Sequence, residues 1–120
     1  MIDKKFAQEF AQEWVSAWNA HDLDAILSHY SDDFEMTSPF ISSVAGGTGN
    51  TLKGKAAVAE YWKVALEKFP DLKFELSDVL VSQYSLIIYY RSVMNKMAAE
   101  IMMFGADGEM VKSIAHYDEI

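Results

Sequence analysis

The sequence predicts an α+β domain in which a curved, cone-shaped antiparallel sheet wraps around three helices from the N-terminal half. Helical periodicity of apolar residues is confined to the first 69 residues, and strand-like alternation fills most of the remainder. Helices followed by a strand meander are typical of α+β architectures. The 120 residues contain no linker or repeat, so we expect a single domain spanning residues 1–120.

Aromatic residues at four-residue steps mark the first helix. Phe6, Phe10, Trp14 and Trp18 form one stripe, which predicts a helix over residues 5–20. Asp22 is placed to cap a short second helix. A third helix is expected over 55–69, ended by Pro70.

Strands are expected over 34–38, 72–76, 86–94, 97–104 and 110–117, and the Ser/Gly/Thr-rich residues 42–54 predict a loop. Two-residue turns are expected at 95–96 and at 107–108. These turns would place both Arg91 and Ala115 opposite Glu100. A register slip by one residue would exchange the two faces of the sheet.

The expected register divides the last three strands into two faces. One face carries Ile87, Tyr89, Arg91, Val93, Ala98, Glu100, Met102, Phe104, Val111, Ser113, Ala115 and Tyr117. The other carries Ile88, Tyr90, Ser92, Ile101, Met103, Lys112, Ile114 and His116. Both faces are substantially apolar, so the convex face needs a partner. We expect a homodimer through Ile88, Tyr90, Ile101, Met103 and Ile114.

Composition and charge exclude several classes of function. The net charge is −8 with no basic cluster, which argues against nucleic-acid binding. No apolar run approaches the ~20 residues of a membrane span, and the first residues lack the apolar segment of a signal peptide. The expected location is therefore the cytoplasm. The chain has no cysteine and only scattered histidines, so we expect no metal site and no cofactor.

Three short strings carry a family resemblance: residues 18–24 (WNAHDLD), 30–34 (YSDDF) and 104–111 (FGADGEMV). Their order and spacing resemble the nuclear transport factor 2 superfamily, in its SnoaL-like and ketosteroid isomerase-like branch. The resemblance covers nearly the whole chain. It implies an aromatic-lined pocket inside the cone, although this scaffold hosts several chemistries.

The resemblance to ketosteroid isomerases can be carried over residue by residue. Trp14 stands where those enzymes place an oxyanion-binding tyrosine, Ser38 where they place the aspartate base, and Glu100 where they place a second oxyanion acid. One carboxyl group is thus kept and the base is replaced. Limonene epoxide hydrolases need two aspartates where this chain has Val93 and Ala115. Neither known reaction is therefore expected.

Glu100 is the candidate acid or base, and Arg91 is the candidate residue that orients it. The alternative is a structural ion pair between the two, which would hold the carboxyl ionised. The expected ligand-binding residues are Trp14, Tyr30, Met36, Ser38, Trp62, Tyr89, Met102, Ser113 and Tyr117, whereas Trp18 and Tyr61 are interpreted as plain core.

The sequence therefore predicts a pocket for a small, largely apolar organic ligand. If the protein is an enzyme, we expect isomerase, lyase or hydrolase chemistry by acid/base catalysis. The alternative is a non-catalytic dimeric module that binds a ligand or a protein.

Overall fold

The computed structural model describes residues 2–47 and 49–120. The described elements are α1 (Lys4–Asn19), α2 (Leu23–Leu27), β1 (Tyr30–Thr37), α3 (Ile41–Ala45), β2 (Thr51–Lys53), α4 (Lys55–Lys68), β3 (Glu75–Val81), β4 (Ser85–Arg91), a 3-10 turn (Val93–Asn95), β5 (Met97–Phe104) and β6 (Met110–Tyr117). The predicted α+β class is confirmed.

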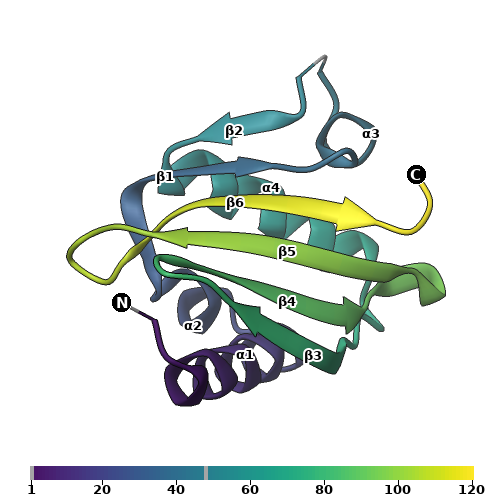
Figure 1. The fold of residues 1–120 in the computed structure, drawn as a ribbon. Coiled ribbons are helices and arrows are strands. Elements are labelled where there is room, and N and C mark those ends of the chain that lie inside the picture. Colours follow the sequence, from purple (N-terminus) through teal and green to yellow (C-terminus); the bar gives the residue numbers. More distant parts are fainter. Residues whose placement is uncertain (1, 48) are drawn as a thin grey trace.

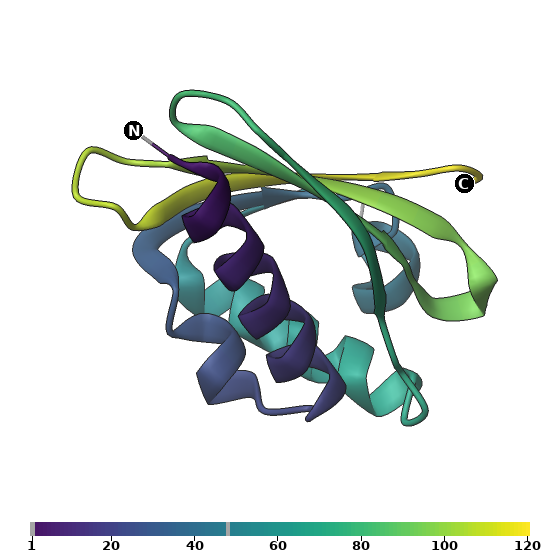
Figure 2. The same cartoon turned by 60° about the horizontal axis from the view of Figure 1, so that its bottom comes forward.

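Within the described residues, six strands form one sheet in the order β2-β1-β6-β5-β4-β3 (Figure 1). Four neighbouring pairs are antiparallel. β1 and β6 instead run parallel, so the sheet is mixed where a fully antiparallel one was expected. Figure 2 shows the sheet bending over the helices, with α1, α2 and α4 beneath its concave face.

The aromatic stripe of α1 produces the packing that was expected of it. The Asp3 carboxylate caps the helix by accepting a hydrogen bond from the backbone N–H of Phe6 at 2.8 Å. Phe10, Trp14 and Trp18 are buried. Their recurrence at every fourth position places them on the single helix face that meets the sheet.

The end of α1 is fastened to the segment before β3 by a side-chain amide. Asn19 donates its amide N–H to the carbonyl of Phe74 at 3.0 Å and accepts from the backbone N–H of Phe74 at 2.6 Å. These two bonds occupy the backbone carbonyl and N–H of Phe74, so neither group pairs with a neighbouring strand. The strand expected over 72–76 therefore begins only at Glu75.

Residues 42–54, expected to be a loop, contain most of α3 and all of β2. β2 pairs with the outer edge of β1. Thr48, which falls in this stretch, lies outside the described residues.

The turn between β4 and β5 differs from the expected two-residue turn at 95–96. Three residues, Val93–Asn95, form it, and the backbone N–H of Ser92 donates to the carbonyl of Lys96 at 2.7 Å. Compared with the expected turn, the pairing of β4 with β5 is shifted by three positions, since Arg91 lies opposite Met97 and not opposite Glu100. Because side chains alternate along a strand, every residue of β4 changes face.

The consequence is a corrected register around Glu100. Its β4 partner is Ile88, and the expected partner Arg91 lies opposite Met97. Its β6 partner is Ala115, as expected. At the far end of that hairpin a bulge pairs Phe104 with Met110 in place of Val111.

The two faces of the sheet are therefore assigned differently on β4. Ile88 and Tyr90, expected on the convex face, are buried in the core, whereas Tyr89 is 42 % exposed. Ile87 and Tyr89 lie on the convex face, the same face as Ile101.

In the part of the chain that the structure describes, no helix combines the length and apolar character needed to cross a membrane.

Candidate functional site

The main site is a cavity of about 350 Å³ between the concave face of the sheet, α1 and α4. Its lining residues are Trp14, Trp18, Tyr30, Met36, Phe40, Ser43, Val44, Tyr61, Trp62, Ala65, Lys68, Phe69, Leu72, Phe74, Tyr90, Ser92, Val93, Met94, Glu100 and Tyr117. Ser43, Lys68 and Met94 are exposed and form part of its rim. This volume suits a compact organic molecule.

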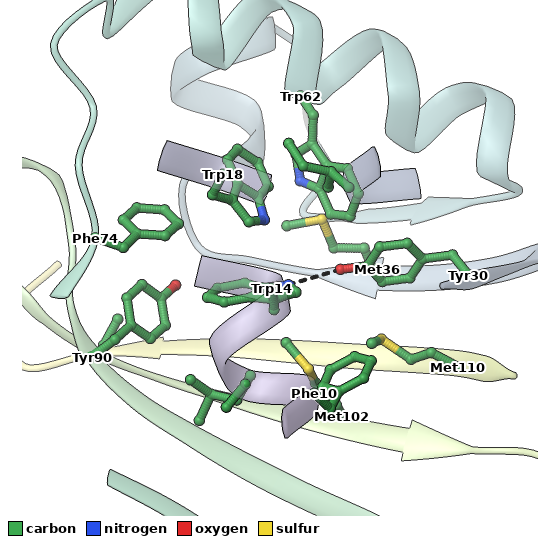
Figure 3. Packing of buried hydrophobic residues seen from close by; sticks show 14 of the residues in the cluster. Phe10, Trp14, Trp18, Tyr30, Met36, Trp62, Phe74, Tyr90, Met102 and Met110 are labelled. Atoms are coloured by element: carbon green, nitrogen blue, oxygen red, sulfur yellow. Dashed lines mark hydrogen bonds between the residues drawn. The ribbon is translucent and has the colours of Figure 1, made fainter. Parts of the chain in front are cut away.

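Stacked aromatic rings form one wall of the cavity (Figure 3). Trp14 stacks on Phe74 with ring centroids 5.5 Å apart and an interplanar angle of 19°. Trp18 meets Trp62 edge to face at 5.2 Å. Because Asn19 holds the Phe74 backbone, this wall is fixed to both α1 and the sheet.

Glu100 is the carboxyl group of the cavity. It is 6 % exposed and lies between Ile88 and Ala115 on the neighbouring strands. The Tyr90 hydroxyl donates to its Oε1 at 3.3 Å. Burial raises the pKa of Glu100 from 4.5 to about 7, and the hydrogen bond from Tyr90 opposes part of that rise. Both protonation states are therefore accessible near neutral pH.

The tyrosines of the cavity remain neutral hydroxyl donors. Burial raises the pKa of Tyr61 to about 12. Burial also raises the pKa values of Tyr30, Tyr90 and Tyr117 well above their usual range. The Tyr30 oxygen accepts from Trp14 Nε1 at 3.0 Å, so its own proton stays free to donate.

The expected pair of Arg91 with Glu100 is wrong. Arg91 is exposed, and its Nη1 donates to the backbone carbonyl and side-chain Oδ1 of Asn95 at 3.2 and 3.0 Å. It is the only arginine in the sequence. Tyr89, expected in the pocket, is exposed on the opposite face. Both corrections follow from the three-residue turn between β4 and β5.

Of the other expected site residues, six line the cavity: Trp14, Tyr30, Met36, Trp62, Glu100 and Tyr117. Ser38, Met102 and Ser113 are buried without lining it. The Ser38 hydroxyl accepts from the backbone N–H of Phe40 at 3.3 Å.

Sequence reasoning missed nine polar or aromatic residues of the cavity: Trp18, Phe40, Ser43, Tyr61, Lys68, Phe69, Phe74, Tyr90 and Ser92. Tyr90 and Ser92 were assigned to the wrong face, and Trp18 and Tyr61 were interpreted as plain core. Periodicity predicted correctly that both are buried, but it does not distinguish a core side chain from one that borders a cavity. Among the described residues, no group of His, Asp and Glu is arranged as a metal site.

Comparison with known proteins agrees with this fold. The model of the SnoaL-like domain family matches residues 11–113. A SnoaL-like protein of unknown function from Burkholderia thailandensis is 50 % identical, with 98 % of each chain covered and a TM-score of 0.90. No curated protein matches the chain. The chain belongs to the SnoaL-like domain family.

More distant structures share the fold alone. A protein from Agrobacterium tumefaciens, proposed to be an isomerase of the SnoaL-like family, is 15 % identical over 93 % of this chain and 97 % of that one, with a TM-score of 0.75. A protein from Sinorhizobium meliloti, proposed to be a polyketide cyclase, is 12 % identical over 90 % and 94 %, with a TM-score of 0.72.

Proposed function

We propose that the protein binds a compact, largely apolar organic molecule in the aromatic cavity and transfers a proton on it through Glu100. The observation that carries this proposal is the setting of Glu100. The carboxyl group is buried at the cavity wall, and the chain's one arginine is bonded elsewhere. A buried carboxyl without a paired cation exchanges its proton near neutral pH, as a general acid or base must.

The neighbouring hydroxyl groups suit such a reaction. Ionised Glu100 would remove a proton from a carbon next to a carbonyl group and, once protonated, return it to another position. The neutral hydroxyl of Tyr30 would donate to the developing oxyanion. Isomerisations and eliminations beside a carbonyl group begin with such a proton transfer, whereas in a hydrolase Glu100 would instead take a proton from water. A metal or redox cofactor is not part of this proposal.

Deuterium exchange tests the proposal without knowledge of the natural substrate. Phenylacetone is small enough for the cavity and carries exchangeable protons beside its carbonyl group. We expect the wild type to accelerate their exchange in heavy water, followed by proton NMR, increasingly as the pH rises through about 7. Replacement Glu100→Gln should lower the protein-dependent rate by ~10²–10⁴.

The matched control is Glu75→Gln, which makes the same chemical change at an exposed position on β3. It should exchange as fast as the wild type. Equal rates for the wild type and Glu100→Gln would show that Glu100 is not the proton carrier.

The second candidate is a non-catalytic dimeric module, and the convex face of the sheet favours it. Leu80 is 56 % exposed and Tyr89 42 % exposed on this face, and Ile87, Ile101 and Ile114 are only partly buried. An apolar surface of this kind suits a second copy of the chain. Binding of phenylacetone without any exchange would favour this candidate over the enzyme.

A further inference from the structure

The indole N–H of Trp18 is a buried hydrogen-bond donor with no partner among the described residues. Trp18 is 5 % exposed and lines the cavity. Figure 3 shows its nitrogen on the side of the ring that faces Trp14 and Met36. Trp14, one turn earlier on α1, differs because its N–H donates to Tyr30.

The described contacts of the Trp18 ring are aromatic, and its N–H makes no hydrogen bond to any of the described residues. Its ring packs against Trp14 at 6.1 Å, Trp62 at 5.2 Å and Phe74 at 5.5 Å between centroids. Buried tryptophan N–H groups ordinarily find a partner, because leaving one unpaired is unfavourable. Trp18 borders the cavity, so a bound ligand can supply the acceptor once a neighbouring side chain moves aside to open the N–H.

We propose that Trp18 determines specificity by donating a hydrogen bond to an acceptor oxygen of the cavity ligand. The inference rests on the proposed function and adds a requirement to it. The Trp14 ring contacts both Trp18 and Tyr90, at 6.1 and 5.0 Å, and Tyr90 binds Glu100. The Trp18 donor and the Glu100 carboxyl are thus separate polar points in an apolar cavity.

The ligand class follows from these two points. It is a compact cyclic molecule with a carbonyl, ester or ether oxygen for Trp18. The group that exchanges a proton with Glu100 lies elsewhere on the same molecule. A pure hydrocarbon would leave the Trp18 N–H unpaired and would bind more weakly.

Two pairs of probes isolate this hydrogen bond. Acetophenone and α-methylstyrene have nearly the same shape but differ in a carbonyl oxygen against a methylene group, and the corresponding naphthalene derivatives form a larger pair. We expect each ketone to bind about tenfold more tightly than its alkene in titrations followed by tryptophan fluorescence. The Trp18 indole resonance in proton–nitrogen correlation spectra should move downfield with the ketone and not with the alkene.

Two variants assign the effect to the correct tryptophan. Trp18→Phe should lose most of the preference for each ketone over its alkene, because it keeps an aromatic ring and loses the donor, and only a contribution from the Tyr30 hydroxyl would remain. Trp62→Phe is the matched control and should weaken both probes while the ketone preference remains. The spectra of the wild type decide the question even if Trp18→Phe fails to fold.

The outcomes separate this inference from the proposed function. If ketone and alkene bind the wild type equally, as they would if a resident water satisfied the N–H, the Trp18 inference fails and the cavity proposal stands. Preference lost in Trp62→Phe but kept in Trp18→Phe would also overturn it. If no probe of either size binds, the cavity proposal fails, and this inference fails with it.

Discussion

The unfolding free energy of Glu100→Gln, taken relative to that of the wild type, should be higher in alkaline solution than in acid. In the native state Glu100 keeps its proton up to its raised pKa of about 7, whereas an unfolded chain releases it near 4.5. Between these values the native state binds one proton more than the unfolded state. The free energy of unfolding of the wild type therefore falls as the pH rises through this window.

The magnitude follows from the width of the window. Each pH unit removes about 1.4 kcal/mol, so the interval from 4.5 to about 7 removes about 3 kcal/mol in all. Glutamine has no proton to lose and escapes this penalty. Its second amide hydrogen leaves a buried donor to satisfy, which costs about 1–3 kcal/mol at every pH. The change with pH, and not the absolute difference, is therefore the signal.

Urea unfolding at one fixed protein concentration measures this change. Wild type and Glu100→Gln are compared at pH values below 4.5 and above 7, with exposed Glu75→Gln as the control. The difference in unfolding free energy should move by about 3 kcal/mol in favour of Glu100→Gln. A difference that stays the same at every pH would refute the burial of Glu100 without a cation.

Four further outcomes are expected. Tyr90→Phe should raise the pKa of Glu100 above about 7 in an NMR titration, because the variant lacks the hydrogen bond that stabilises the ionised carboxylate in the wild type. An unchanged or lower pKa would contradict the geometry. Arg91→Ala should leave that titration unchanged and alter stability by less than about 0.5 kcal/mol in urea unfolding. Ile101→Glu should convert a dimer to a monomer in light scattering, and a monomeric wild type would remove the dimer proposal. Wild type should not isomerise a steroid ketone, because Ser38 stands where the aspartate base is expected; turnover by the wild type would show that no base is missing.

The helical half of the fold could be predicted because its signals are local. The stripe of Phe10, Trp14 and Trp18 needs only the helical repeat to define a buried face. The start of β3 could not be predicted in the same way. Leu72 and Phe74 alternate like strand residues, but the Asn19 side chain occupies the Phe74 backbone from 55 residues away in sequence.

The hairpins show how one turn limits prediction of a site. The Asp107-Gly108 signal placed Glu100 opposite Ala115 correctly, although a bulge shifts the pairing beyond Met103. The earlier turn contains no glycine, yet Met94 and Asn95 adopt φ angles of 56° and 59°. Asparagine is tolerant of this left-handed region, but methionine gives no sign of it. The sequence signal therefore favoured a shorter turn than the one that forms.

This turn lies at the rim of the cavity, where Val93 and Met94 line it, and it decides the chemistry of the buried carboxyl group. A two-residue turn would place a guanidinium group opposite Glu100, and so close a cation would hold the carboxyl ionised and depress its basicity. The three-residue turn gives Glu100 the hydroxyl of Tyr90 instead. A neutral donor stabilises a carboxylate far less than a cation does, so the effect of burial prevails and the proton remains exchangeable near neutral pH. The left-handed conformation of Met94 and Asn95 is thus a condition for the proposed acid/base role of Glu100.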